Sequence, residues 1–251
     1  MQKNYKNIVV IGATSSIAEH CLRLWVDQYE AEITLVGRNQ ERLDQVAVDL
    51  RIRSRDALIR TIQMNFMDAN DIQRFTDDLN IDHDIDIVLI AHGYLPSQVD
   101  CQNDLNLCQS VMEVNAISPA LFAEAFVGHM EKKRKGTIAI FGSVAGDRGR
   151  KSNYIYGAAK GLIERYVQGL QHRLAKTGVR VILIKPGPTD TPMTSKLKLE
   201  GLHLASVGSV SKSIVNGIHA GWLTIYAPAK WALIMMIVRN LPKFIFNTMN
   251  L

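Results

Sequence analysis

The sequence predicts an α/β fold in which helices cover both faces of a doubly wound parallel sheet. From Asn7 to Lys185, short apolar runs alternate with longer segments that have the apolar spacing of a helix. Strands and helices that alternate in this way are joined by right-handed crossovers, which gives a parallel sheet. No repeat or linker interrupts the pattern. We therefore predict one domain over residues 1–251, with a substrate lid within 192–228 and an apolar, basic tail over 229–251.

Each predicted element has its own pattern. The strands are short apolar runs, at Asn7–Ile11, Glu32–Val36, Leu58–Met64, Asp86–Ala91, Thr137–Gly142 and Val179–Lys185. The helices carry apolar residues three and four positions apart, at Ser15–Tyr29, Arg38–Arg53, Ala69–Leu79, about Asp104–Lys133 and Ser152–Thr177.

Composition limits the class of protein. The chain has 47% hydrophobic and 21% charged residues, as an ordinary soluble globular protein has. Its three cysteines show no paired spacing, which favours a reducing compartment over a disulfide framework. The chain enters its first strand with no room for a signal peptide, so we expect a cytoplasmic protein. The histidines form no closely spaced pair, and we expect no metal site.

The C-terminal region carries the basic excess. The net charge is +5, and Pro192–Leu251 alone holds six basic residues against Glu200. No aromatic–basic interleaving indicates nucleic acid. The eight apolar residues Trp231–Val238 are too few for a membrane span, which needs ~20. In the amphipathic ending, a polar stripe of Lys243, Asn247 and Asn250 lies opposite Phe244, Ile245 and Met249. It suits peripheral contact with the inner face of a membrane; the alternative is packing on the lid or on a second subunit.

The first strand–helix turn, Gly12–Ala18, has the features of a phosphate site. Backbone N–H groups at the helix start and the positive end of its dipole attract anions, and small residues allow close approach. The alternative is a plain turn with a serine cap. At the end of the second strand, Gly37-Arg38-Asn39 holds a basic residue and no acid. Because a basic group there suits the 2′-phosphate of NADP, we favour NADP(H) over NAD. A solvated Arg38 is the alternative.

Ser143, Tyr156 and Lys160 carry the predicted chemistry. Tyr156 and Lys160 are four residues apart on one helix face, and Ser143 ends the strand before them. We expect the ammonium to lower the pKa of the phenol, which then exchanges a proton while Ser143 binds a carbonyl oxygen. This is the chemistry of ketone and alcohol interconversion. The alternative is an ordinary exposed helix face. Asn115, inside a long helix, is expected to bond to the backbone and hold a local irregularity.

These residues resemble the short-chain dehydrogenase/reductase family over about residues 7–191, with a Rossmann-like, seven-stranded sheet. The resemblance implies a catalytic tetrad of Asn115, Ser143, Tyr156 and Lys160, in which Asn115 holds a water. It also implies that the cofactor contacts Asn115, Tyr156, Lys160 and the following residues: Gly12, Thr14, Ser15, Ser16, Ile17, Arg38, Asn65, Phe66, Ala91, His92, Gly93, Pro186, Gly187, Thr189 and Thr191. Ser16 and Ala18 replace two glycines of the family turn. Members of the family usually pair through long helices, so we expect a homodimer or homotetramer.

A narrower resemblance extends from residue 136 to the C-terminus. The loop Gly146–Lys151 and the ending Tyr226–Trp231 look like the decaprenylphosphoryl-2-keto-pentose reductase that partners a decaprenylphosphoryl-ribose epimerase. This resemblance implies a keto sugar on a polyprenyl phosphate as substrate. Ser143, Arg148 and Arg150 are the predicted substrate-binding residues, with the two arginines near a substrate phosphate. The alternatives are a reductase of another lipid or acyl-thioester ketone, or a non-catalytic dinucleotide-sensing protein.

Overall fold

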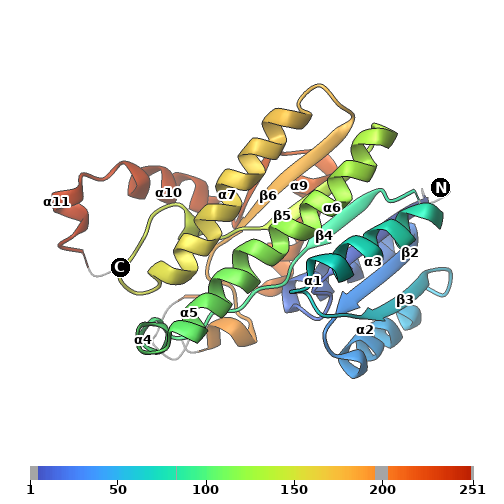
Figure 1. Cartoon of the computed structure of the whole chain (residues 1–251), viewed down its shortest axis with the longest axis horizontal. Helices are drawn as coiled ribbons and strands as arrows, with labels where there is room; N and C mark the ends of the chain where they lie inside the picture. Colours follow the sequence, from blue (N-terminus) through green and yellow to red (C-terminus); the bar gives the residue numbers. More distant parts are fainter. Residues whose placement is uncertain (1–4, 83, 196–202, 250–251) are drawn as a thin grey trace.

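A seven-stranded parallel sheet forms the centre of the computed structural model, which describes residues 5–82, 84–195 and 203–249 (Figure 1). The strand order is β3-β2-β1-β4-β5-β6-β7. The strands are β1 Tyr5–Ile11, β2 Glu30–Gly37, β3 Leu58–Gln63, β4 Ile87–Ile90, β5 Gly136–Phe141, β6 Val179–Pro186 and β7 Thr224–Ala227. The predicted fold class is confirmed. Only β7, the edge strand beside β6, was not located from the sequence.

Helices cover both faces of the sheet. The first face packs on α1 Ser16–Gln28, α2 Gln40–Arg53 and α9 Val207–Ala220. The second face packs on α3 Ala69–Asp82, α6 Ser118–Lys133 and α7 Tyr154–Leu174. The central strands are apolar at successive positions because both of their faces are buried, as in Ile8–Ile11 of β1.

The predicted helix Asp104–Lys133 is interrupted. It consists of α5 Leu105–Met112, a π-helical turn Glu113–Ile117 and α6, and the short helix α4 Gln98–Asn103 precedes it. Leu105–Lys133 is the one described stretch long and apolar enough to cross a membrane, but half of its most apolar part is buried inside the protein. A core helix of a soluble protein passes the same test.

The chain leaves the sheet after β7 through α10 Lys230–Asn240 and α11 Lys243–Phe246, which extend from one end of the molecule (Figure 1). Of the segment 192–228, where a lid is predicted, α9 packs on α1 and β7 joins the sheet. Pro192, Met193 and Thr194 do line the cleft described below. The rest of the predicted lid includes residues 196–202, which lie outside the described residues, as does Asn250 of the tail.

Candidate active site

A cleft with a volume of about 910 Å³ opens at the carboxyl ends of the strands. This is the edge at which doubly wound sheets bind ligands. The β1–α1 turn forms one end of the cleft, β5 and α7 form its middle, and α10 closes the far side. Among the described residues, no cluster of three or more His, Cys, Asp or Glu side chains has the spacing of a metal site.

The β1–α1 turn fits a phosphate. Gly12 has φ +82°, and a Cβ on it would lie 2.6 Å from the backbone N of His92. Only glycine suits this position, because it combines a left-handed conformation with close backbone contact. The Ser15 side chain makes no capping hydrogen bond to α1, so the N–H groups of the first turn remain available to an anion. All five predicted residues of the turn line the cleft: Gly12, Thr14, Ser15, Ser16 and Ile17.

Two arginines stand at the end of β2. Arg38 lines the cleft as predicted, and Arg42, one helical turn later, lines it as well. The Arg38–Arg42 spacing was a signal in the sequence that the prediction missed. Phe66 also lines the cleft, but Asn65 does not: it is exposed, and its Oδ1 accepts a hydrogen bond from the Met67 N–H. Asn65 therefore caps a turn, which corrects its predicted cofactor contact.

His92 lies buried between the two ends of the cleft, and its neighbours Ala91 and Gly93 line the same wall. Its Nε2 is 2.9 Å from the Ser118 hydroxyl, while its Nδ1 has no hydrogen-bond partner among the described residues. Burial, helped by the charges of Lys160 and Arg38, lowers the pKa of His92 to about 3. The ring is therefore neutral near pH 7.

Asn115 stabilises the π-helical turn through hydrogen bonds to the backbone, as predicted. Its Nδ2 donates to the carbonyl oxygens of Val111, at 2.9 Å, and Tyr94, at 2.7 Å. Its Oδ1 accepts from the Tyr94 N–H at 3.0 Å. A Cβ on Gly93 would lie 3.0 Å from this oxygen, so the small residue allows Asn115 to approach the β4 end. Both N–H groups of the amide bond to backbone, and Asn115 does not itself line the cleft, so its predicted contacts with a water and with the cofactor stay predictions.

Ser143, Tyr156 and Lys160 meet in the middle of the cleft, as predicted. The Ser143 hydroxyl hydrogen-bonds to the Tyr156 phenol and accepts from the Ala145 N–H at 3.1 Å. Lys160 is 3% exposed, and its Nζ donates to the Phe141 carbonyl oxygen at 2.8 Å and lies 5.8 Å from the centroid of the Tyr156 ring. The two hydroxyls thus present one surface to a carbonyl group, with an amine behind them.

The predicted acidity of Tyr156 is wrong for this arrangement. Burial raises the pKa of Tyr156 to about 12, and the hydrogen bond with Ser143 offsets only part of this rise. Burial also lowers the pKa of Lys160 to about 7. Because part of the Lys160 population is then neutral near pH 7, this side chain provides little stabilisation of a Tyr156 phenolate. Helical spacing predicted the contact but not its dielectric environment.

A buried ionic cluster lies behind the catalytic residues. The Lys185 ammonium is 2.5 Å from an oxygen of Asp147 and 2.8 Å from an oxygen of Glu164, and the Lys185 side chain is 2% exposed. Burial alone would lower the pKa of Lys185, but the two carboxylates together outweigh it and raise this pKa. Asp147 follows the Ser143 loop and Glu164 lies one helical turn after Lys160, so the cluster ties together the segments that carry the catalytic groups.

The structure separates the two arginines of the predicted substrate site. The Arg148 Nη1 donates to the carbonyl oxygens of Val238, at 2.6 Å, and Leu241, at 2.7 Å, and its guanidinium stacks on the Phe246 ring. Arg148 therefore holds the end of α10, which corrects its predicted role. Arg150 does line the cleft.

Helix α10 supplies a wall that the sequence analysis did not assign. Trp231, Ile234, Met235 and Val238 line the cleft. A Cβ on Gly187 would lie 2.0 Å from the Trp231 Nε1, so a glycine is required where the β6 end meets this helix. The apolar run was visible in the sequence but was interpreted as a membrane or docking segment. Beside this wall, the predicted residues after β6 also line the cleft: Pro186, Gly187, Thr189 and Thr191.

Comparison with known proteins places these features in a family. Residues 6–201 match the family model described as short chain dehydrogenase. An uncharacterized oxidoreductase of Staphylococcus epidermidis is 32% identical over 212 residues, which cover 80% of this chain and 87% of the relative. One from Mycobacterium tuberculosis is 26% identical over 251 residues and covers 96% of both chains. These relatives are described only as uncharacterized oxidoreductases, so the narrower likeness to a keto-pentose reductase is not shown.

Solved structures share the fold. A Burkholderia cenocepacia short chain dehydrogenase, solved in complex with NADP, has a TM-score of 0.80 at 19% identity and covers 96% of this chain and 100% of its own. A Sphingobium yanoikuyae short-chain dehydrogenase, in complex with NADPH, has a TM-score of 0.80 at 20% identity and covers 98% and 96%. The family model spans most of the chain and includes Ser143, Tyr156 and Lys160. The chain therefore belongs to the short-chain dehydrogenase family.

Proposed function

We propose that this protein transfers hydride between NADP(H) and a ketone or secondary alcohol. The observation that carries the proposal is the Ser143–Tyr156 hydroxyl pair on the wall of a large cleft, with the Lys160 amine buried behind it. A bound reduced nicotinamide would supply the hydride. The residues after β6, with the Gly93 wall opposite, are proposed to hold its ring and ribose.

Tyr156 is the proposed proton donor. As hydride reaches the carbonyl carbon, the phenolic proton passes to the carbonyl oxygen, which Ser143 holds by a hydrogen bond. Because burial raises the pKa of Tyr156 to about 12, the phenol retains its proton near pH 7 and is suited to reduction. Lys160, with a pKa lowered to about 7 by burial, is the proposed source of the replacement proton. Asn115 acts as a positioning residue through the π-helical turn.

A preference for NADP(H) over NAD is supported by Arg38 and Arg42. Both line the end of the cleft at the carboxyl end of β2, where the ribose 2′-phosphate of NADP would lie. Arginine binds a phosphate through two parallel hydrogen bonds, whereas a carboxylate at this place would repel the phosphate. The NADP and NADPH bound to the two structural relatives agree with this choice.

The walls of the cleft favour a substrate with both apolar and polar parts. The α10 side chains form an apolar wall, whereas Arg150, Ser152 and Asn153 line the cleft from the loop before α7. A keto sugar carried on a polyprenyl phosphate combines these properties and is our leading substrate class. A ketone on another lipid or on an acyl thioester is the second candidate, because it would use the same apolar wall.

The surface supports two further parts of the proposal. Outward-facing apolar side chains of α10 and α11, with Lys230, Arg239 and Lys243, suit peripheral contact with an anionic membrane.

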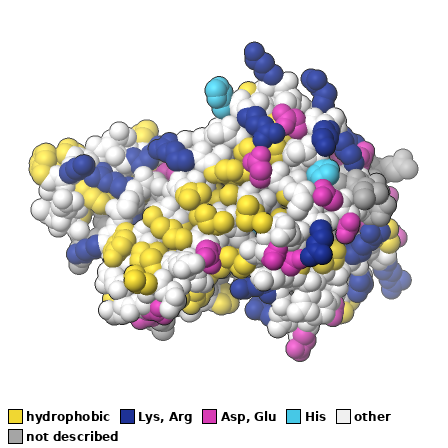
Figure 2. All heavy atoms as spheres, viewed as in Figure 1, with side chains coloured by type: hydrophobic (Ala, Val, Ile, Leu, Met, Phe, Trp, Pro, Cys, Tyr) yellow, Lys and Arg dark blue, Asp and Glu magenta, His cyan; other side chains and the backbone are white. Residues whose placement is uncertain are grey.

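Hydrophobic side chains also gather over α5, α6 and α7 (Figure 2), where Leu105 and Leu162 are exposed. This face is proposed to pair two copies of the chain, and light scattering of the purified protein measures the oligomeric state.

The function is tested by incubating the purified protein with NADPH and one ketone at a time. The set includes small ketones, acyl-thioester ketones and keto sugars on lipid carriers. We expect ketone-dependent oxidation of NADPH, with an alcohol product in equal amount, for at least one class. Oxidation with none of them, in protein shown to bind NADPH, would contradict the proposal.

A further inference from the structure

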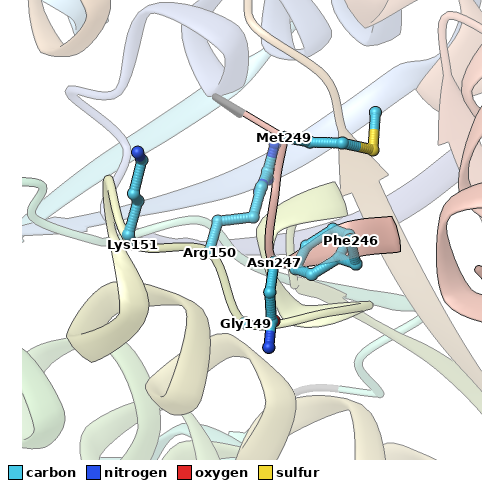
Figure 3. A pocket seen from close by; sticks show the side chains of 6 residues that line it. All are labelled: Gly149, Arg150, Lys151, Phe246, Asn247 and Met249. Carbon is cyan, nitrogen blue, oxygen red and sulfur yellow. The ribbon is translucent and has the colours of Figure 1, made fainter. Parts of the chain in front are cut away.

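A second, smaller pocket lies beside the cleft, between the loop after β5 and the C-terminal tail (Figure 3). Its volume is about 200 Å³. The loop contributes Gly149, Arg150 and Lys151, and the tail contributes Phe246, Asn247 and Met249. The lining thus combines two cations and an amide with two apolar side chains, and it includes no acidic residue among those described.

Arg150 is shared by the two cavities. It lines the cleft on one side and the small pocket on the other. Figure 3 shows its side chain reaching from the loop toward the tail segment that carries Met249. Its Nε is buried and has no hydrogen-bond partner among the described residues. A buried donor without a partner is unfavourable, so a ligand oxygen that comes within hydrogen-bond distance of this guanidinium would be stabilised.

The neighbouring charges leave Arg150 available to a ligand. Asp147, the nearest carboxylate along the loop, is held by Lys185 at 2.5 Å in the buried cluster. Arg148 is bound to the carbonyl oxygens at the end of α10. Burial lowers the pKa of Arg150 and Asp147 raises it, but a guanidinium remains charged at any physiological pH.

A second polar atom without a partner belongs to a residue of the same loop. The Asn153 Oδ1 is also buried without a partner among the described residues, and Asn153 lines the cleft together with Arg150. One atom is a donor and the other an acceptor. A ligand that satisfies both has an anionic or carbonyl oxygen near Arg150 and a hydroxyl near Asn153.

We propose that the small pocket binds a phosphate group of the substrate, while the substrate ketone lies in the cleft beside Ser143 and Tyr156. This inference rests on the proposed function and adds to it a place for the charge. Arg150 would bind the phosphate through two N–H groups, Lys151 would add a second cation, and the Asn247 amide would donate a hydrogen bond. Phe246 and Met249 would contact an apolar group attached to the phosphate.

Calorimetric titration with inorganic pyrophosphate tests the pocket, in protein saturated with NADP⁺ so that the phosphate sites of the cofactor are filled. Arg150→Met is compared with wild type and with Arg55→Met, a matched loss of an exposed arginine before β3. We expect pyrophosphate to bind the wild type and Arg55→Met equally, and Arg150→Met roughly tenfold more weakly or worse, because a charge-assisted contact is lost. Lys151→Met, on the same loop, is expected to show a smaller loss.

Equal binding of pyrophosphate to wild type, Arg150→Met and Lys151→Met would overturn the inference. So would the absence of binding to the wild type. If Arg150→Met fails to fold, Lys151→Met decides alone. A parallel titration with dodecyl phosphate below its micelle concentration distinguishes the sources: tighter binding that Phe246→Ser weakens indicates a lipid-borne phosphate, and equal binding indicates a free one.

The failure of this inference is distinguishable from that of the proposed function. If the wild type reduces ketones but Arg150 makes no difference to pyrophosphate binding, the pocket assignment fails and the reductase stands. If pyrophosphate binding depends on Arg150 but no ketone oxidises NADPH, the anion pocket stands and its assignment to a ketone substrate fails.

Discussion

The catalytic middle of the cleft and its outer end differ in how their polar groups are satisfied. The cations of the middle are satisfied within the chain: Lys160 donates to the Phe141 carbonyl oxygen, and Lys185, which does not line the cleft, lies between two carboxylates. The neutral His92 ring is the exception there, since its Nδ1 has no partner among the described residues. At the outer end, the Arg150 Nε and the Asn153 Oδ1 are buried without partners among the described residues. Contacts within the chain therefore determine where the chemistry takes place, whereas the outer end holds groups that a ligand would satisfy. Substitutions in the middle should be the more damaging.

The largest effect is expected for Tyr156→Phe. Loss of the proton donor should lower kcat by roughly 10²–10⁴-fold, the range that general acid catalysis contributes. The Kd for NADPH should change little, because the ring remains. Tyr154→Phe is the matched control, since Tyr154 is on the same helix but 44% exposed. Steady-state kinetics and fluorescence titration of NADPH measure the two quantities, and a fully active Tyr156→Phe enzyme would remove the basis of the mechanism.

Lys185→Met should cost the most stability. Removal of the cation leaves the Asp147 and Glu164 carboxylates buried without it, which typically costs about 3–5 kcal/mol. Lys185→Arg keeps the charge and should lose less. Lys176→Met removes an exposed lysine and should be close to neutral. Denaturant unfolding gives the free energies, and equal stability of Lys185→Met and Lys176→Met would show that the cluster does not stabilise the fold.

Arg38→Asp tests the cofactor end of the cleft. A carboxylate in place of the guanidinium repels the 2′-phosphate and accepts a hydrogen bond from a 2′-hydroxyl. We expect the ratio of kcat/KM for NADPH over NADH to fall by roughly 10–100-fold, in line with one charge-assisted contact. Arg55→Asp controls for the change of net charge. An unchanged ratio in Arg38→Asp would refute the assignment of Arg38 to the 2′-phosphate.

The middle of the cleft was also the part that the sequence predicted well, since its signals are local. Buried parallel strands produce continuous apolar runs, and the spacing of Tyr156 and Lys160 places both on one helix face. The bonding of Asn115 to nearby backbone followed from a polar amide inside a helix. The raised pKa of Tyr156 was not predictable in this way, because it depends on burial by segments distant in the sequence.

The outer end was predicted less well, because long-range packing builds it. Arg148 contacts carbonyl groups 90 and 93 residues away, and no spacing rule indicates such a pair. The apolar run of α10 was recognised, but the sequence does not show that one side of the helix faces the cleft. The predicted cofactor contact of Asn65 was missed for a local reason. The Asn65 side chain accepts a hydrogen bond from the backbone N–H two residues later and so forms a turn of its own.

The free energy of unfolding should depend on pH through His92, which lies buried in the wall of the cleft. Burial lowers the pKa of His92 to about 3, below its unfolded value of 6.5. Between these values the unfolded chain binds a proton that the folded chain does not, so stability is present above pH 6.5 and is lost as pH falls toward 3. At about pH 5 the loss is about 2 kcal/mol. Unfolding of His92→Asn should show a smaller loss between pH 7 and about pH 5, unlike exposed His172→Asn; equal slopes would contradict this.

The smallest effects are expected on the outward side of the tail. Because α10 lines the cleft, truncation of the tail would damage the site and the surface together. Single substitutions separate the two roles. Lys243→Gln should weaken binding to anionic vesicles by about 1 kcal/mol, or roughly fivefold, the contribution of one basic residue at a charged surface. Ile237→Ser, at a position that is 55% exposed, should weaken it through lost apolar contact.

Vesicles of phosphatidylserine and phosphatidylcholine, separated by flotation, measure this binding. Lys176→Gln, which removes an equal charge at an exposed position just after α7, is the matched control. Both tail variants should keep wild-type turnover with a water-soluble ketone, since neither residue lines the cleft. If all three proteins float equally, Lys243 and Ile237 contribute nothing to the binding; if the wild type does not float, the exposed apolar face of α10 and α11 does not bind these membranes. Packing of the tail on a second subunit, the alternative given for it from the sequence, would then be the interpretation that its exposed side chains still support; the pairing proposed for the face over α5, α6 and α7 is separate from it.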